Sequence, residues 1–187
     1  MDNNDAKHIA ALLERIGRLV STEAHVEGLL PVQWEALRYL DKANRFSKTA
    51  AAVTAYLGIT KGTVSQTLKT LENKGLLKKR VDGKDRRINH LSLTAKGRRL
   101  LGRDPLDTTI VAVNDLGDAA QRTLSKGLQT LLSVRLAAQD RKPFGQCRDC
   151  RYFAREHPHG DPHFCQLLKE KLANTDSLAI CHEQLPA

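Results

Sequence analysis

The segment 57–97 restricts the possible folds of this chain more than any other part of its sequence. It reads LGITKGTVSQTLKTLENKGLLKKRVDGKDRRINHLSLTAKG. In order, these residues predict a turn, a helix with one polar face, a glycine stop, a short apolar strand, a basic turn, a second strand and the start of another helix. A helix-turn-helix followed by a two-stranded β-wing has this order, and such a unit places one helix in the major groove of DNA.

Apolar residues at helical spacing predict one long helix over 8–30 before this segment. Pro31 is expected to end that helix and to open a second one through Trp34 and Leu40, since proline suits a first helical turn. Asn44–Ser47 is expected to be a loop. The predicted fold is therefore mainly helical.

Capping residues mark the ends of the next helices. Thr49–Leu57 is predicted as a helix that Gly58 ends. Thr60 and Thr94 are good N-caps for two further helices, because a threonine side chain can accept a hydrogen bond from a free backbone N–H. The predicted strands are 76–81 and 88–93, joined by the turn 82–85.

The segment after the wing is also predicted to be helical. Asp104-Pro105 breaks the helix that Thr94 begins, and helical character resumes over 106–114. Asp118 is expected to cap a final long helix. Its apolar face is formed by Leu124, Leu128, Leu131, Leu132 and Leu136.

Positive charge is concentrated on the winged segment. The whole chain has a formal net charge of +9, whereas residues 44–103 hold 15 Lys and Arg against 3 Asp and Glu. The remaining residues are therefore slightly acidic. A basic block inside a folded motif is typical of a surface that binds phosphate groups.

The helix that follows Thr60 has the pattern of a recognition helix. Val64, Leu68 and Leu71 recur at helical spacing and are expected to pack inward, which leaves polar residues on the opposite face. Glutamine can bond adenine edges, lysine can reach guanine or phosphate, and the free N–H groups of a first turn can hold phosphate. The candidate DNA-binding residues are Thr60, Lys61, Gly62, Thr63, Ser65, Gln66 and Lys69 on the helix and Lys84, Arg86 and Arg87 on the wing tip.

This part of the chain resembles the DNA-binding core of MarR-family regulators. Their wing pattern, Asp-x-Arg, a strand and Leu-Thr-x-x-Gly, is matched by Asp85, Arg87, Leu93, Thr94 and Gly97. The resemblance is specific over about 45–100 and weaker over 8–45 and 98–140. It implies a mostly helical, triangular homodimer whose first and last helices form the dimer interface.

The resemblance also implies how such a protein works. A homodimer would bind near-palindromic double-stranded DNA, with base contacts from Lys61–Gln66 and a minor-groove contact from Arg87, helped by Arg86. Members of this family are often repressors that small phenolic molecules, oxidants or metals release from DNA. His25, Trp34 and Tyr39 are candidates for lining an effector pocket, although core packing is the usual role of such residues.

The resemblance and the patterns together divide the chain into four parts. These are a dimerisation helix (1–30), a winged helix-turn-helix (31–103), C-terminal dimerisation helices (104–140) and a cysteine-rich module (146–187). The MarR resemblance does not account for the last part.

All four cysteines, Cys147, Cys150, Cys165 and Cys181, lie in the final segment with the spacing C-x2-C-x14-C-x15-C. A C-x2-C turn brings two thiolates onto one metal, and two later cysteines can complete a tetrahedron. We expect structural zinc first and an iron–sulfur cluster second, since four thiolates serve both. A redox-active dithiol and structural disulfides are the remaining alternatives. Because the module follows the predicted dimer helix, metal gain or loss is expected to act through that helix.

The function predicted from these features is transcription regulation rather than catalysis. A thiol oxidoreductase that uses Cys147 and Cys150 is the enzyme alternative, but no βαβ pattern surrounds the pair. A non-specific architectural DNA-binding protein is the other alternative. The N-terminus, MDNNDAKH, has no signal-peptide core, and no apolar run approaches the ~18 residues of a membrane span, so a cytoplasmic protein is expected.

Overall fold

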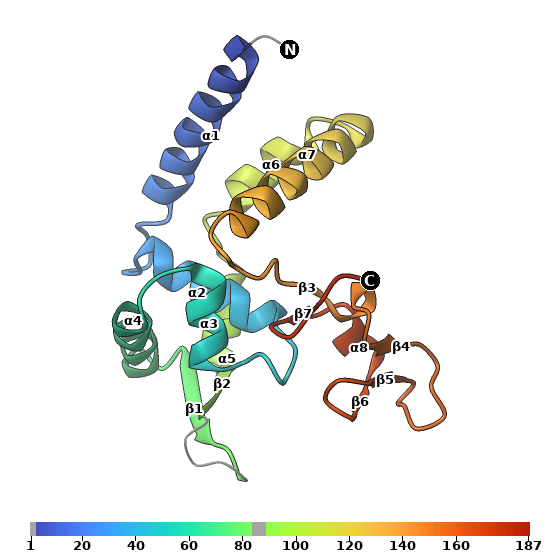
Figure 1. Ribbon diagram of the computed structural model, residues 1–187. Coiled ribbons are helices and arrows are strands. Elements are labelled where there is room, and N and C mark those ends of the chain that lie inside the picture. The colour runs from blue at the N-terminus through green and yellow to red at the C-terminus, as the bar shows by residue number, and fades with distance from the viewer. Residues whose placement is uncertain (1–2, 84–88) are drawn as a thin grey trace.

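The computed structural model describes residues 3–83 and 89–187, which fold into helices and small antiparallel sheets (Figure 1). This confirms the mainly helical fold. The helices are α1 (Asn3–Glu23), α2 (Pro31–Lys42), α3 (Ala50–Leu57), α4 (Lys61–Asn73), α5 (Ala95–Leu101), α6 (Asp107–Asn114), α7 (Asp118–Ala137) and α8 (Asn174–Ser177), with a 3-10 turn η1 at Cys147–Asp149. The strands are β1 (Leu77–Val81), β2 (Asn89–Leu93), β3 (Gly145–Gln146), β4 (Phe153–Ala154), β5 (His163–Cys165), β6 (Glu170–Leu172) and β7 (Ile180–Cys181).

The hydrophobic core lies where α2, α3 and α4 pack against the β1–β2 hairpin. Trp34, Leu37 and Leu40 of α2 have no exposed surface. Leu71 of α4 is buried to the same extent, and Leu68 is 2% exposed. These side chains follow the helical spacing seen in the sequence, so each helix turns one face inward. The result is a rigid unit that carries α4 on its surface.

The wing is an antiparallel hairpin whose base is locked to α5. Leu77 pairs with Leu93 at that base. Thr94 caps α5 by accepting a hydrogen bond from the Gly97 backbone N–H. A Cβ atom on Gly97 would lie 2.1 Å from the carbonyl oxygen of Leu76, so only glycine fits there. This close approach explains the Leu-Thr-x-x-Gly pattern physically.

Two predicted helix boundaries were wrong. The first helix ends at Glu23 instead of Leu30, because the chain turns back to bury Ala24 and Leu29 in the core. That turn uses positive φ angles at Glu27 and Gly28. Asp118 is the first residue of α7 rather than its cap, and Gly117 occupies the N-cap position.

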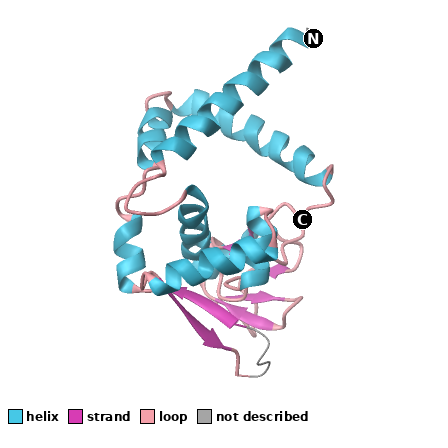
Figure 2. Ribbon diagram, turned by 90° about the vertical axis from the view of Figure 1, so that its left-hand side faces the viewer, coloured by secondary structure: helices cyan, strands magenta, loops and turns pink. Residues whose placement is uncertain are grey.

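Helices α1, α6 and α7 extend away from the core, as Figures 1 and 2 show from two directions. Neither α6 nor α7 contains a buried residue. Large apolar side chains on α1 and α7 are 40–63% exposed, among them Ile16, Leu19, Leu128 and Leu131. Among the described residues, therefore, nothing fully covers these apolar faces. Within residues 3–83 and 89–187, no helix is both long and apolar enough to span a membrane.

The cysteine-rich segment forms a separate small lobe beside the core (Figure 1). Strands β4, β5 and β6 make one antiparallel sheet, and β3 pairs with β7. Leu172 is a buried aliphatic side chain of this lobe, alongside the buried Cys147 and Cys181. A core of this size stabilises a lobe of ~40 residues weakly, so its stability must draw on another source.

Candidate nucleic-acid interface and cysteine cavity

Helix α4 presents a polar face to solvent and an apolar face to the core. Val64, Leu68 and Leu71 are buried, as the sequence predicted. The predicted DNA-facing residues of the helix are all exposed: Thr60, Lys61, Gly62, Thr63, Ser65, Gln66 and Lys69. The arrangement leaves a row of hydrogen-bonding and cationic groups free to meet another molecule.

The start of α4 is fixed by a side-chain cap. The Thr60 hydroxyl oxygen accepts a hydrogen bond from the Thr63 backbone N–H at 3.2 Å. Thr60 and Thr63 also share a hydrogen bond between their hydroxyl groups at 2.9 Å. This cap sets the direction of the first helical turn, where free N–H groups favour an anion.

The described part of the wing is basic. Lys78 and Arg80 of β1 are exposed, and Lys79 forms an ion pair of 2.7 Å with Glu72 of α4. This pair connects the wing to the C-terminal part of α4. The predicted wing-tip residues Lys84, Arg86 and Arg87 lie outside the described residues, so their role stays a prediction from the sequence.

The four cysteines line one small cavity of about 20 Å³ in the C-terminal lobe. Tyr152, Phe153, Leu167, Leu172 and Glu183 complete its wall. The C-x2-C pair and the two later cysteines are thus brought together, and all four are free thiols. Yet among the residues that the structure describes, no group of three or more Cys, His, Asp or Glu side chains is arranged to hold a metal ion.

Polar groups point at the cysteine sulfur atoms. The side-chain amide of Asn44 donates a hydrogen bond to Cys147 Sγ at 3.2 Å, and the Leu168 backbone N–H donates to Cys165 Sγ at 3.4 Å. The Cys147 thiol also interacts with Cys181, which lowers the pKa of Cys181 and raises that of Cys147. One thiol of this buried pair therefore loses its proton far more readily than the other.

Two histidines that lie close to cysteines in the sequence, His163 and His182, have other roles. Both ring nitrogens of His163 have partners, since Nδ1 accepts from the Glu156 backbone N–H and Nε2 bonds to Asn174 Oδ1. The ring of His182 packs against Phe144 at 5.3 Å. Neither histidine lines the cysteine cavity.

Two of the three residues considered for an effector pocket have the packing role that was expected as usual for them. Trp34 and Tyr39 are buried core residues with 0% and 1% of their surface exposed, whereas His25 is exposed. Tyr39 donates its hydroxyl hydrogen to the Ser47 carbonyl oxygen, and its ring packs on Tyr56 at 4.5 Å. These aromatic side chains have the packing role that is usual for their type.

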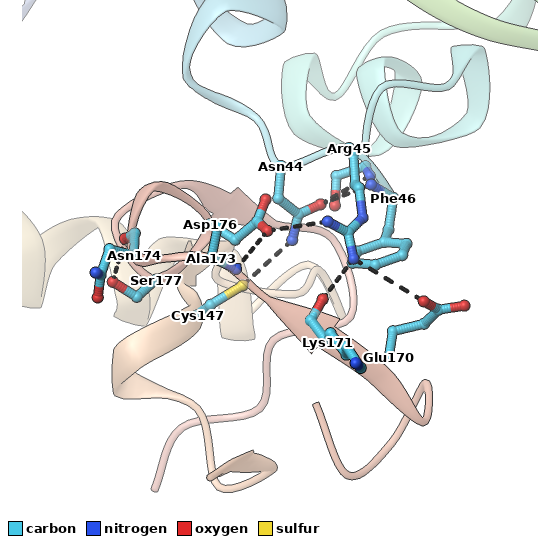
Figure 3. Close-up of polar contacts among 11 residues, drawn as sticks. Asn44, Arg45, Phe46, Cys147, Glu170, Lys171, Ala173, Asn174, Asp176 and Ser177 are labelled. Carbon is cyan, nitrogen blue, oxygen red and sulfur yellow. Dashed lines mark hydrogen bonds and ion pairs between the residues drawn. The ribbon is translucent and has the colours of Figure 1, made fainter. Parts of the chain in front are cut away.

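Sequence reasoning missed the residues that join the two lobes. Asn44 and Arg45, in the loop between α2 and α3, contact the cysteine-rich lobe (Figure 3). Ser47 of the same loop accepts a hydrogen bond from the His182 backbone N–H. The one available signal was a set of polar residues between two apolar helices, which is also what an ordinary loop looks like.

Comparison with known proteins agrees with this geometry. Residues 27–88 match the model of the MarR family. The fold resembles FabT of Streptococcus pneumoniae solved in complex with DNA, at 26% identity and a TM-score of 0.59, with 71% of this chain and 99% of that chain covered. It resembles MepR of S. aureus in a DNA complex at 25% identity and a TM-score of 0.55, with 67% and 96% covered.

A MarR transcriptional regulator from Methanosarcina mazei Go1 shares the fold at 21% identity and a TM-score of 0.59, with 73% of this chain and 99% of that chain covered. No curated protein matches the sequence. The chain therefore has the MarR winged-helix fold over most of its length. Because the similar chains are covered almost completely, roughly a quarter of the present chain is additional to them.

Proposed function

We propose that this protein is a sequence-specific DNA-binding transcription regulator, a repressor that acts as a homodimer on a near-palindromic operator. The observation that carries the proposal is the polar, exposed face of α4 on a MarR-type winged unit. The similar structures of FabT and MepR were solved with DNA, which supports the same ligand here. The similar protein from Methanosarcina mazei Go1 is a MarR transcriptional regulator, and this supports regulation over thiol oxidoreductase chemistry.

Each side chain of the interface has a distinct role in this proposal. Thr60 and the first turn of α4 hold a backbone phosphate, because helix N-termini attract anions. Gln66 and Lys61 reach base edges in the major groove, with Ser65 and Lys69 beside them. Arg87 enters the minor groove from the wing, where a narrow groove concentrates negative potential.

The homodimer follows from the uncovered apolar faces of α1 and α7. Two copies that pair through these helices would bury Ile16 and Leu131, which one chain leaves about half exposed. A symmetric dimer presents two α4 helices to two half-sites about one DNA turn apart. The expected operator is therefore an inverted repeat.

The operator and the role of Arg87 can be tested together. Repeated selection of random-sequence duplexes with the full-length protein should enrich one inverted repeat. Replacing Arg87 with alanine should weaken binding to that duplex by about 1–3 kcal/mol in a fluorescence anisotropy titration. Gln129→Ala on the exposed face of α7 is the control and should bind as the wild type does.

Two results would count against these proposals. An Arg87→Ala protein with unchanged affinity would exclude the minor-groove role. Enrichment of no sequence, with tight binding that competitor DNA abolishes, would instead indicate a non-specific architectural protein.

The proposed cofactor is a metal centre at Cys147, Cys150, Cys165 and Cys181, in a module that is structural or sensory. Zinc is the first candidate, since a cavity of about 20 Å³ has room for one small particle. An iron–sulfur cluster is the alternative, and the protein would then be a redox or iron sensor.

The visible absorption spectrum of protein purified without oxygen distinguishes these occupants. A brown protein whose absorbance disappears in a Cys150→Ser variant would identify an iron–sulfur cluster. A colourless protein that contains one zinc per chain would identify zinc. A colourless protein without bound metal would exclude the metal centre.

A further inference from the structure

The loop 43–49 lies between the cysteine cavity and the helix-turn-helix. Asn44 in this loop is 2% exposed and contacts the C-terminal lobe through two groups. Its side-chain amide donates to Cys147 Sγ at 3.2 Å (Figure 3). Its backbone N–H donates to the Ile180 carbonyl oxygen at 2.9 Å. The loop thus touches one cysteine directly and the residue before another.

Ser47 makes a second link to the same lobe. It is 1% exposed, and its hydroxyl oxygen accepts a hydrogen bond of 2.8 Å from the backbone N–H of His182. His182 directly follows Cys181 in the chain. The loop is therefore fixed beside two of the four cysteines, Cys147 and Cys181.

Arg45 adds an electrostatic contact at the rim of the interface. Its guanidinium group forms an ion pair of 3.2 Å with Asp176 and also donates to the Lys171 carbonyl oxygen (Figure 3). Arg45 is half exposed, so this ion pair contributes little to stability on its own. Its role is to orient the loop relative to β6 and α8.

The other end of the loop is bound to the DNA-binding unit. Thr49 caps α3, because its hydroxyl oxygen accepts from the Ala52 backbone N–H. The Lys48 carbonyl oxygen accepts a hydrogen bond of 2.7 Å from Leu91 in the wing strand β2. Five residues therefore separate Asn44 from Ala50, the first residue of α3, and three separate it from Lys48, which contacts the wing.

Metal binding would order the C-terminal lobe that this loop contacts. Donors such as Asn44 and the Leu168 backbone N–H, aimed at cysteine sulfurs, are the outer contacts that orient and tune metal–thiolate ligands. Without a metal, the C-terminal lobe has a small hydrophobic core and correspondingly little means to hold a fixed shape. The order of the lobe, and of the loop packed on it, then depends on the occupied cavity.

We infer that the four cysteines hold a thiolate-ligated metal centre that fixes loop 43–49, so that DNA affinity depends on metal occupancy. This inference rests on the proposed function and extends it. Asn44 is the positioning residue of the coupling. From the sequence alone, metal binding was expected to affect DNA binding through α7, because the cysteine-rich module follows that helix. The contacts of loop 43–49 provide a different route, through the loop that precedes α3.

The first test compares metal-loaded and metal-depleted full-length protein. Depleted protein is reloaded with zinc sulfate or, without oxygen, with ferrous iron and sulfide, which distinguishes the two metal sources. Loading should raise the hydrogen-exchange protection of residues 43–57. It should also increase affinity for the selected duplex about tenfold, an ordinary size for coupling between two sites.

The second test uses Asn44→Asp. The carboxylate keeps an acceptor for the Phe46 and Ser47 backbone N–H groups, but the donor to Cys147 Sγ is lost. The metal content of the variant should stay the same. The difference in hydrogen-exchange protection between loaded and depleted protein should fall towards zero, and the tenfold ratio of their DNA affinities should fall towards one. Asn114→Asp makes the same chemical change on exposed α6 and should retain both.

The inference would be overturned if no sample bound metal. It would also be overturned if metal changed neither the hydrogen exchange nor the DNA affinity of the wild-type protein, or if Asn44→Asp responded to metal as Asn114→Asp does. Failure to select any duplex would refute the proposed function instead. Exchange measurements would then still decide whether the metal centre orders residues 43–57.

Discussion

At the scale of single residues, the ion pair between Arg38 and Asp104 determines how the chain leaves the winged unit. Two hydrogen bonds of 2.6 and 2.7 Å join the guanidinium group to the carboxylate, and both side chains are largely buried. Asp104 Oδ1 also accepts from the Leu106 backbone N–H. Burial alone would raise the pKa of Asp104, but the bonds from Arg38 and Leu106 outweigh it and lower that pKa.

Replacing Asp104 with asparagine should therefore destabilise the protein. The expected loss is about 2 kcal/mol at pH 7, a typical value for hydrogen bonds to charged groups. A carboxyl group with a lowered pKa stabilises the fold above its unfolded pKa of about 3.9 and loses that contribution as pH falls through the folded value. Urea unfolding should thus show a gap between wild type and variant at pH 7 that narrows below pH ~4.

Asp41→Asn on the same helix, α2, is the matched control, since Asp41 is exposed. It should unfold as the wild type does at both pH values. An Asp104→Asn protein as stable as this control at pH 7 would show that the ion pair contributes nothing to stability.

Residue roles differed in how far the sequence could predict them. The inward face of α4 was predictable, because helical spacing alone assigns Val64, Leu68 and Leu71 to one side. Asn44 was not, since its partner Cys147 lies 103 positions away in the chain. Arg38 and Asp104 likewise meet across 66 positions. Local patterns contain no information about such pairs.

At the scale of elements, the C-terminus of α3 depends on two residues from different parts of the chain. Gly58 ends the helix with a positive φ of 68°. Arg141, beyond the end of α7, donates hydrogen bonds to the carbonyl oxygens of Ala55 and Tyr56. A Cβ atom on Gly58 would lie 2.2 Å from the Arg141 guanidinium group. The glycine thus serves both the backbone turn and this contact.

Gly58→Ala should consequently cost more than the same change at Gly75. Both glycines have positive φ, where alanine is strained by about 1–2 kcal/mol. A Cβ atom at Gly75 would meet nothing within 4 Å, whereas at Gly58 it must displace Arg141. Thermal or urea unfolding of the two variants gives the difference directly. Equal losses of stability in the two variants would mean that the Arg141 contact is energetically neutral. When Arg141 is also replaced with alanine, Gly58→Ala and Gly75→Ala should destabilise the protein equally.

The starts of three helices were predictable because a threonine cap marks each of them, whereas the cap predicted at Asp118 was wrong. Thr49, Thr60 and Thr94 cap α3, α4 and α5 as their positions suggest. The end of α1 was not predictable, because the helical pattern continues past Glu23 in the sequence. Burial of Ala24 and Leu29 in the core decides that boundary, and this is a tertiary effect.

At the scale of the whole molecule, the exposed apolar faces of α1 and α7 are the main reason to expect a dimer. Replacing Leu131 with glutamate should prevent association, because it places an unpaired charge in the proposed interface. Sedimentation equilibrium should show dimerisation weakened by about 3 kcal/mol or more.

Gln129→Glu on the same helix, α7, is the control for added charge and should remain dimeric. If Leu131→Glu dimerises like this control, then α7 does not form the interface through Leu131. A wild-type protein that stays monomeric at every concentration would refute the dimer itself.

The exposed helices α1, α6 and α7 have a consequence for how the activity of the protein depends on its concentration. Helices α6 and α7 bury no side chain within one chain, so in the proposed dimer they would gain stability when two copies meet. Below the dimer dissociation constant, the concentration of the active species therefore rises with the square of the chain concentration. Halving the supply of the protein would then cut the active dimer about fourfold, so that its target genes would respond sharply to modest changes in its synthesis or degradation.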